Sequence, residues 1–330
     1  MTAQGPGDAV SVVIPTYNSA ALVVQAIDSA LGQTAVPAEV LVVDDGSSDD
    51  TAARVAAYGN RVRYLHQPNR GVASARNLGV REARGKLIAF LDADDVWHPR
   101  KLEIQAAALA RHPALGLLGT ATYDWPAPAH PDLGPAPPDV PAVVPWESLV
   151  IKNYFTTSSI LARREVLDRV GPFDSGLQGP EDHDLWIRAA EVAPVANLAL
   201  PLTGYRSVQG SLSQQAATME MGMRRILAKL DERDAWRGRG LLRRKAFSYF
   251  YYSTAYMHHA AGSGGIAMRN LLKSFAWYPL PYRRSEVRQP LARPKRLAVF
   301  LARSFSRPPA GPPNDAAGPG RRPRPDGGRS

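Results

Sequence analysis

Residues 87–97 of the 330-residue chain read LIAFLDADDVW, and this stretch decides the fold class. Its first five residues are apolar throughout, which is the pattern of a strand covered on both faces within a parallel sheet. The strand runs directly into Asp92, Ala93 and Asp94. We therefore expect a buried parallel strand whose carboxyl end presents two carboxylates.

Short apolar runs alternate with helical periodicity in the sequence that precedes this strand. The runs predict strands at 10–14, 40–43 and 62–65, and the periodic segments predict helices at 20–31, 50–58 and 72–83. Such alternation requires right-handed crossovers and predicts an open α/β sheet. Ligands bind outside the carboxyl ends of the strands in such sheets. We therefore expect the loops at 15–18, 44–47 and 92–95 to meet at one site.

The second half of the chain predicts further elements and then a change of character. A stretch at 124–145 has eight prolines in 22 residues and is expected to form a surface loop. Helices are predicted at 99–110, 146–152, 164–170 and 184–192, and strands at 115–119, 158–162 and 195–200. Later residues predict only helices, at 219–230, 241–261 and 266–277. We divide the chain into an α/β domain at 1–213, a helical extension at 214–282 and a tail at 283–330.

The helical extension contains a run of aromatic side chains. We expect them to form the core of a helical hairpin, and the alternative is a surface that faces a membrane or a partner. The run consists of Phe247, Tyr249, Phe250, Tyr251, Tyr252 and Tyr256.

The net charge of +10 is concentrated in the tail. Residues 283–330 hold 12 Lys and Arg against 3 Asp and Glu, a net charge of +9, so the rest of the chain is nearly balanced. We therefore expect no nucleic-acid partner. The Pro, Gly and Arg content predicts disorder from about residue 306. The basic and apolar residues of 283–303 suit either peripheral contact with an anionic membrane or a solvated tail.

Composition and motifs exclude several classes of site. The chain has no Cys, so disulfides and thiolate chemistry are excluded. No G-x-x-x-x-G-K-[ST] loop, no G-x-G-x-x-G turn after the first strand and no G-x-S-x-G elbow occurs. No apolar stretch is long enough to predict a transmembrane helix, and the first residues lack the pattern of a signal peptide.

Three acidic motifs remain as candidates for chemistry. Asp92 and Asp94 would repel each other unless a cation lies near them, and oxygen ligands suit Mg²⁺ or Mn²⁺ holding a diphosphate. The alternative is that these acids cap the next helix, as Asp95 is expected to do. Asp44 and Asp45 can accept a hydrogen bond from a base or a ribose, and Tyr17 offers a face for stacking. Glu181 and Asp182 suit either a general base with a neighbouring acid that orients it, or the acidic start of a helix.

Four stretches in this order make the chain resemble glycosyltransferase family 2, the inverting nucleotide-sugar transferases with a GT-A fold. They are SVVIPTYNSA, VLVVDDGSSDDT, NRGVASARNLGVREARGKLIAFLDADDVW and VGPFDSGLQGPEDHDLWIR, and the resemblance covers residues 9–213. It implies an open mixed sheet flanked by helices. It also implies a metal-dependent hexosyltransferase that moves a sugar from a UDP- or dTDP-sugar to an acceptor hydroxyl, with Mn²⁺ or Mg²⁺ as cofactor.

The resemblance assigns roles to individual residues. Thr16 and Tyr17 line the base pocket, Asp44 and Asp45 bind the base and ribose, and Arg76 and Asn77 lie beside the nucleotide. Asp92 and Asp94 form the D-x-D motif, with Asp92 also at the nucleotide and Asp94 as the direct metal ligand. Asp182 is the base that activates the acceptor, next to Glu181. Val208 stands where many relatives have a His that helps to hold the metal, so Arg206 or Gln209 is expected at the diphosphate instead.

The resemblance further implies a role in cell-surface polysaccharide or glycan assembly, with a glycan or a lipid-linked acceptor. We expect a cytoplasmic enzyme, peripheral on the inner face of the cell membrane. One rival is a sugar-phosphate nucleotidyltransferase, which would require a Gly-rich triphosphate loop after the first strand that this sequence lacks. The other is a nucleotide-sugar-binding or assembly protein without turnover.

Overall fold

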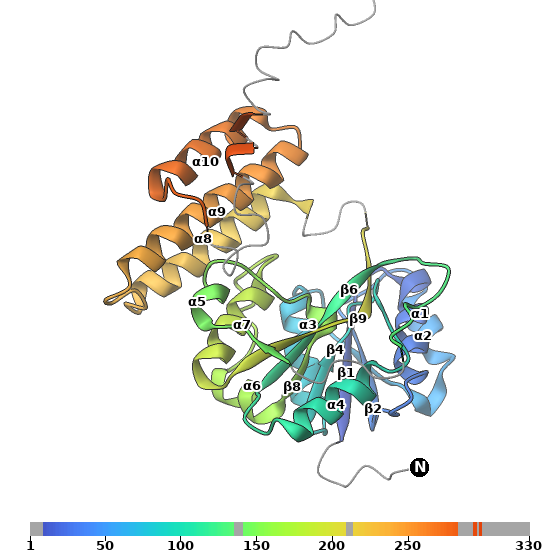
Figure 1. Cartoon of the computed structure of the whole chain (residues 1–330). Helices are drawn as coiled ribbons and strands as arrows, with labels where there is room; N and C mark the ends of the chain where they lie inside the picture. Colours follow the sequence, from blue (N-terminus) through green and yellow to red (C-terminus); the bar gives the residue numbers. More distant parts are fainter. Residues whose placement is uncertain (1–8, 135–140, 209–213, 283–292, 296, 299–330) are drawn as a thin grey trace, which may run out of the picture.

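The computed structural model describes residues 9–134, 141–208, 214–282, 293–295 and 297–298. Figure 1 shows a twisted sheet with helices on both faces and, beyond one end of it, a layer formed by the last three helices. Of the segments described, no helix is long and apolar enough to cross a membrane.

A nine-stranded mixed sheet forms the centre of the molecule, in the order β3-β2-β1-β4-β8-β6-β9-β5, with β7 paired to β9. The strands are β1 (Val10–Thr16), β2 (Glu39–Asp44), β3 (Arg63–His66), β4 (Leu87–Phe90), β5 (Val96–Trp97), β6 (Leu117–Trp125), β7 (Ala142–Val143), β8 (Leu161–Arg163) and β9 (Val195–Arg206). β1 to β4 pair in parallel, as the sequence predicts, while β8 is antiparallel to both β4 and β6.

Helices cover both faces of this sheet. They are α1 (Ala20–Leu31), α2 (Thr51–Ala56), α3 (Val72–Glu82), α4 (Lys101–Arg111), α5 (Trp146–Leu149), α6 (Arg164–Val170) and α7 (Glu181–Val192), with single 3-10 turns at Gly59–Arg61 (η1) and Thr157–Ser159 (η2). Side chains alternate between the faces along each strand. Val12 and Ile14 therefore share a buried cluster with α1 and α4, whereas Val13 lies in the cluster of α3 and α7.

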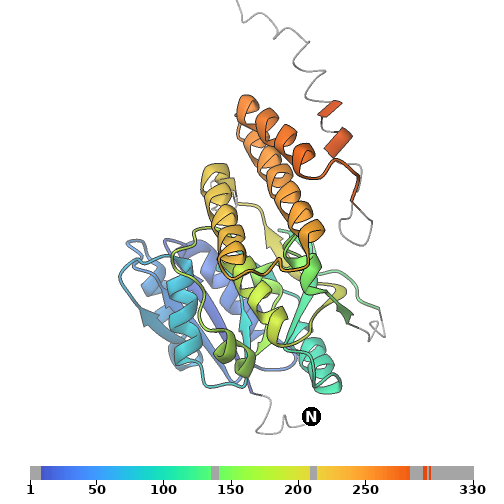
Figure 2. The same cartoon turned by 90° about the vertical axis from the view of Figure 1, so that its left-hand side faces the viewer.

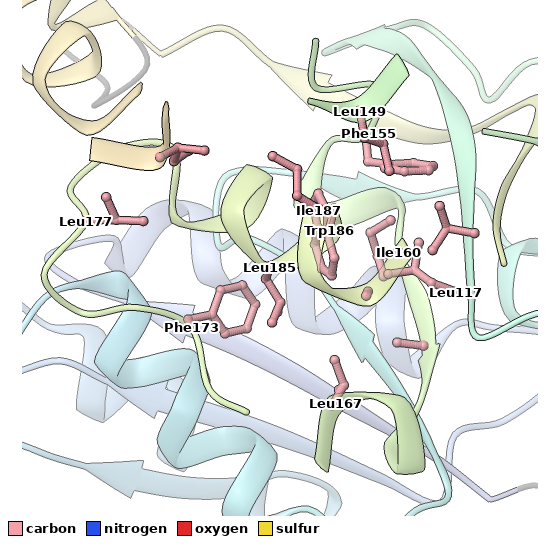
Figure 3. Packing of buried hydrophobic residues seen from close by; sticks show 14 of the residues in the cluster. Leu117, Leu149, Phe155, Ile160, Leu167, Phe173, Leu177, Leu185, Trp186 and Ile187 are labelled. Carbon is pink, nitrogen blue, oxygen red and sulfur yellow. The ribbon is translucent and has the colours of Figure 1, made fainter. Parts of the chain in front are cut away.

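The apolar side of α7 explains why this helix is held firmly against the sheet. Trp186 is fully buried, and its ring lies 6.2 Å from that of Phe90 on β4 and 6.0 Å from that of Phe173. Figure 3 shows Leu185, Trp186 and Ile187 of α7 among the side chains of this cluster. Burying one such aromatic side chain contributes about 1.5–3 kcal/mol, so the first turn of α7 has a fixed position.

Several sequence expectations about element boundaries are wrong. Residues 124–145 are not a loop throughout, because β6 runs to Trp125 and Ala142–Val143 pair with β9. β6 and β7 both pair with β9, and this pairing provides hydrogen-bond partners for their backbone groups despite the nearby prolines. Asp95 does not cap a helix: its buried carboxylate accepts hydrogen bonds from Ser158 Oγ at 2.6 Å and from the backbone N–H of Arg206 at 2.9 Å.

The helical extension shares its core with the α/β domain. It consists of α8 (Ala216–Glu232), α9 (Gly240–Ala260) and α10 (Gly264–Trp277). Ile226, Leu227 and Leu230 of α8 belong to the same buried cluster as Trp186. The contact is close, because a Cβ on Gly222 of α8 would lie 2.5 Å from the Cδ of Pro180, directly before α7.

The aromatic run of α9 packs partly within the hairpin, as expected, and partly in the cluster shared with the α/β domain. Phe250 and Tyr251 are buried, and the Phe247 ring stacks on that of Trp277 with centroids 4.5 Å apart. Tyr256 is the exception, with 49% of its surface exposed.

The expectation that the basic residues of 283–303 can face a membrane is wrong for Arg293. Its side chain is 1% exposed, donates to Ser248 Oγ at 2.7 Å and lies 4.4 Å from the centre of the Tyr282 ring. A side chain buried in this way cannot contact lipid. The predicted disorder from residue 306 lies outside the described residues.

Candidate active site

A cleft of about 540 Å³ opens at the carboxyl ends of β1 and β4. Segments that are far apart in sequence line it: the end of β1, the loop after β4, the end of β9, residues around η2, and the first turns of α7 and α8. Parallel strands place their carboxyl ends on one side of a sheet, which explains why the ends of β1 and β4 meet there. The predicted residues that line the cleft are Thr16, Tyr17, Arg76, Asp92, Asp94, Glu181, Asp182 and Arg206.

Arg76 of α3 forms the floor of this cleft. Its guanidinium donates to Asp92 Oδ1 and to Glu181 Oε1, each at 2.6 Å, and the side chains of Arg76 and Glu181 are both 5% exposed. Burial disfavours the charge on Arg76, but the two carboxylates outweigh it and raise its pKa. Arg76 therefore joins the D-x-D loop to the start of α7.

Asp182 differs from Glu181 in its partners. Its Oδ2 accepts hydrogen bonds from Asn153 Nδ2 at 3.2 Å and from Thr157 Oγ1 at 3.1 Å, while its Oδ1 accepts from the backbone N–H of His183 at 2.6 Å. Burial raises the pKa of this carboxyl, and the nearby Arg76 and these hydrogen bonds oppose the rise. The carboxylate is thus oriented by neutral donors in the wall of the cleft.

Two further acids lie beside Asp92. Burial and the charge of Asp92 raise the pKa of Asp94 to about 6, and burial together with both neighbours raises the pKa of Asp95 to about 8. Within the described part of the chain, no other side chain hydrogen-bonds to the Asp94 carboxylate. Three carboxyl groups are therefore crowded at one point of the cleft, which favours the neutral forms of Asp94 and Asp95 until a cation binds, and the Asp94 carboxyl is open to a ligand.

The arrangement of Asp92 and Asp94 fits a divalent cation. Mg²⁺ in proteins is usually held by one or two carboxylates together with phosphate oxygens and water. No group of three or more His, Cys, Asp or Glu suited to a metal occurs among the residues described. A cation held by Asp92 and Asp94 would take its other ligands from phosphate oxygens and water.

The end of β1 provides groups suited to a nucleotide. Thr16 is buried, and no described residue forms a hydrogen bond with its Oγ1. Tyr17 follows it with half of its surface exposed, so its ring can stack on a base.

Three residues predicted at the nucleotide do not line the cleft. Asp44 accepts from Tyr64 Oη at 2.7 Å, and Asp45 accepts from the backbone N–H groups of Arg70 and Gly71 at 2.9 and 2.8 Å. The Asn77 amide donates to the backbone carbonyl of Phe173 and accepts from its N–H, at 2.9 and 2.8 Å. In this structure the three side chains hold loops in place.

The end of β9 closes the cleft on the side of the D-x-D loop. Arg206 donates from Nε to the backbone carbonyl of Asp94 at 2.9 Å and from Nη2 to Gln25 Oε1 at 2.8 Å. Val208 also lines the cleft. The other residue expected at the diphosphate, Gln209, lies outside the described residues.

Sequence reasoning missed the residues that contact Asp182 or lie near it. Asn153 and Thr157 come from a segment without a recognisable motif, and only the folded chain shows that they hold this carboxylate. Met219 of α8 lines the cleft as well, and its Sδ would lie 2.4 Å from a Cβ on Gly179. Gly179 has a φ of +100°, which glycine adopts most easily, so the pair Gly179-Pro180 is a sequence signal of the tight turn before α7.

Comparison with known proteins finds similarity to glycosyltransferases. The sequence model of Glycosyl transferase family 2 matches residues 11–130. An uncharacterized glycosyltransferase of Rickettsia felis is 32% identical over 194 residues, which are 56% of this chain and 32% of that protein. The chain spans between about a third and three fifths of the length of the first such relatives.

Solved structures share the fold. Staphylococcus aureus TarS 1–349 in complex with UDP-GlcNAc is 18% identical with a TM-score of 0.53, covering 83% of this chain and 93% of that one. A Pyrobaculum calidifontis mannosyltransferase, in complex with GDP-Man and Mn²⁺, is 20% identical with a TM-score of 0.55, covering 92% and 85%. The chain is therefore similar to glycosyl transferase family 2 over residues 11–130, and it has the GT-A fold of these solved structures.

Proposed function

We propose that this protein is an inverting glycosyltransferase that transfers a sugar from a nucleotide sugar to an acceptor hydroxyl. The observation that carries the proposal is the difference in partners between two adjacent acids in the cleft. Glu181 is paired with Arg76, whereas Asp182 is held by Asn153 and Thr157, which are neutral. A carboxylate without a cationic partner can accept a proton, so Asp182 is the better general base.

In the proposed reaction, Asp182 takes the proton of the acceptor hydroxyl as the oxygen attacks the anomeric carbon of the donor. The bond between that carbon and the diphosphate breaks, and the nucleoside diphosphate leaves with the electron pair. Arg76 keeps the first turn of α7 beside the D-x-D loop, because it contacts Glu181 and Asp92 at 2.6 Å each and its contact with Glu181 is buried. Attack from the side opposite the leaving group inverts the configuration.

The donor is proposed to be a UDP- or dTDP-sugar. Tyr17 supplies a stacking face, and the buried Thr16 hydroxyl has no partner among the described residues. Two solved neighbours, TarS and the mannosyltransferase, hold UDP-GlcNAc and GDP-Man. Asp94 and Asp92 would hold Mn²⁺ or Mg²⁺, which supplies positive charge for the diphosphate when bound. Arg206, next to Asp94, is the candidate for a further cationic contact.

The acceptor is proposed to be a glycan or a lipid-linked glycan at a membrane surface. The basic residues of 283–303 would attract an anionic membrane, where each Lys or Arg near the surface contributes about 1 kcal/mol. Replacing Arg283, Arg284, Arg288, Lys295, Arg296 and Arg303 by Gln, with the buried Arg293 kept, should weaken binding to anionic vesicles. Unchanged binding would exclude the tail as a membrane contact.

A thermal-shift panel of UDP-, dTDP- and GDP-sugars with and without Mn²⁺, followed by a transfer assay on each ligand that binds, tests the proposed activity. A ligand at 100 times its Kd should add about 2.7 kcal/mol to the free energy of unfolding. The rival is a protein that binds nucleotide sugars without turnover. Binding that is accompanied neither by transfer nor by hydrolysis of the donor would favour that rival.

A further inference from the structure

The hairpin of α9 and α10 extends beyond α8 at one end of the molecule (Figures 1 and 2). α10 packs against α9 through one face, formed by Ala267, Leu271 and Ser274, which are buried. The opposite face lies in solvent. It is formed by Ile266, Arg269, Leu272 and Lys273, and we call these four residues the α10 face.

The charge of the hairpin has one sign. α9 and α10 together have five Lys and Arg and no Asp or Glu. No described carboxylate pairs with Arg269 or with Lys273, whose ammonium lies 5.3 Å from the centre of the Tyr251 ring. The α10 face is therefore cationic without a counter-charge within the described chain.

The same face exposes large apolar side chains. Leu272 is 55% exposed and Ile266 is 38% exposed. Leu280, which follows the helix, and Tyr256 of α9 are also exposed. Cations beside exposed apolar side chains match an anionic lipid surface. Anionic head groups attract the cations, and the apolar side chains enter the boundary between head groups and acyl chains. A soluble polyanion would use only the charges.

We propose that the α10 face docks on an anionic lipid bilayer. The hairpin is fixed relative to the cleft, because Glu220 of α8 accepts hydrogen bonds from His258 of α9 at 2.7 Å and from Asn270 of α10 at 3.2 Å. Met219, adjacent to Glu220, lines the cleft. Docking through α10 therefore holds the cleft at a constant distance from the membrane, through a structured surface distinct from the tail at 283–330.

Vesicle co-sedimentation of the full-length chain tests the proposal without requiring catalysis, so its failure is independent of the proposed activity. The vesicles contain equal parts of phosphatidylglycerol and phosphatidylcholine, with pure phosphatidylcholine as the comparison. The double variant Arg269→Glu, Lys273→Glu should bind the anionic vesicles about 30-fold more weakly or worse, since two favourable charges are lost. The variant Arg54→Glu, Arg81→Glu, which makes the same change in net charge on α2 and α3, should bind like the wild type.

A second variant distinguishes a lipid surface from a site for soluble polyanions. Ile266→Ser, Leu272→Ser should weaken vesicle binding about 10-fold, because two apolar side chains no longer enter the bilayer. All four positions of the α10 face are at the surface, and unchanged thermal melting confirms that each variant is folded. Equal losses in the α10 and control charge variants would overturn the proposal. An affinity for anionic vesicles that is unchanged in Ile266→Ser, Leu272→Ser would also overturn the proposal.

Discussion

The guanidinium of Arg76 and the carboxylate of Glu181 meet at 2.6 Å beneath the cleft, joining α3 to the first turn of α7. The same guanidinium holds Asp92, so one buried cation fixes the D-x-D loop and the position of the proposed base at the same time. Three elements that are separate in sequence therefore depend on one side chain.

Arg76→Met should destabilise the fold. It keeps a similar volume but leaves the buried Glu181 without a cationic partner, and breaking a buried ion pair from one side costs about 3–5 kcal/mol. Urea unfolding would measure the loss. Arg81→Met on the exposed side of the same helix is the control and should change the free energy of unfolding by less than about 0.5 kcal/mol. Similar values for the two variants would contradict the structural role of Arg76.

Asp182→Asn should lower kcat on the order of 10²–10⁴-fold while leaving nucleotide binding nearly unchanged, because the amide keeps the shape and cannot accept the proton. Steady-state turnover and calorimetric titration with the nucleoside diphosphate separate the two effects. Asp168→Asn, at an exposed position on α6, should behave as the wild type. Loss of nucleotide binding in Asp182→Asn would mean that this side chain is structural.

The activity should fall on the acid side as Asp182 takes up a proton, at a pH above the ordinary range of an aspartate because burial raises its pKa. Thr157→Val removes a hydrogen bond that favours the charged form, so the acid limb of kcat should move to higher pH. Thr156→Val, which removes a neighbouring hydroxyl of the cleft that does not bond to Asp182, should leave the limb in place. An acid limb at the same pH in both variants would argue against Asp182 as the titrating group.

Asp94→Ala should abolish transfer, and EDTA should abolish wild-type activity until Mn²⁺ or Mg²⁺ is added back. The reason is that the departing diphosphate would then lack a counter-ion beside Asp92. Donor turnover in metal-free and metal-loaded buffer gives the measurement, with Asp168→Ala as the matched control. Full activity in the chelator would remove the metal from the mechanism.

His183 should make the fold sensitive to acid. Its ring bonds to the backbone carbonyl of Leu149 at 2.6 Å, and burial lowers its pKa. The unfolded chain, with a His pKa of about 6.5, takes up a proton first as the pH falls. The contribution of His183 to the free energy of unfolding is therefore fully present above a pH of about 6.5 and decreases as the pH falls below it.

Urea midpoints at several pH values between about 5 and 7 would show the effect of His183. His183→Gln can still donate to the Leu149 carbonyl and does not titrate, so its midpoint should depend less on pH. The matched control is His66→Gln at an exposed position. A pH dependence that His183→Gln leaves unchanged would assign the acid sensitivity to other groups.

The parallel half of the fold could be predicted because its strands are apolar throughout and its helices follow at regular spacing. α1 in this half has the bounds that periodicity indicates, at 20–31, and so does α6 after the antiparallel β8, at 164–170. β6 and β9 extend beyond the strands predicted at 115–119 and 195–200. The outer half of β6 has no buried residue and that of β9 contains Pro201 and Gly204, so the pairing of the two strands stabilises these halves more than local propensity does.

The candidate site could be predicted only as far as its motifs reach. Asp92, Asp94 and Asp182 follow recognisable patterns and lie in one cleft. The partners of Asp182 could not be found in this way, because Asn153 and Thr157 approach it through the packing of η2 and α7 rather than through spacing in the chain. The hydrogen bonds that Asp44 and Asp45 make to neighbouring loops have the same origin.

The contact between Gly222 and Pro180 has a consequence for any exchange of parts between this chain and its relatives. A chimaera that joins the cleft residues to a foreign C-terminal segment would need a glycine at the equivalent of position 222, since a methyl group there would meet the Pro180 ring at 2.5 Å. Truncation after the last strand would disturb the structure more. It would expose the apolar surface beside α7 that Ile226, Leu227 and Leu230 cover, and it would remove Met219 from the cleft. The smallest transplantable unit of this chain therefore extends through α8.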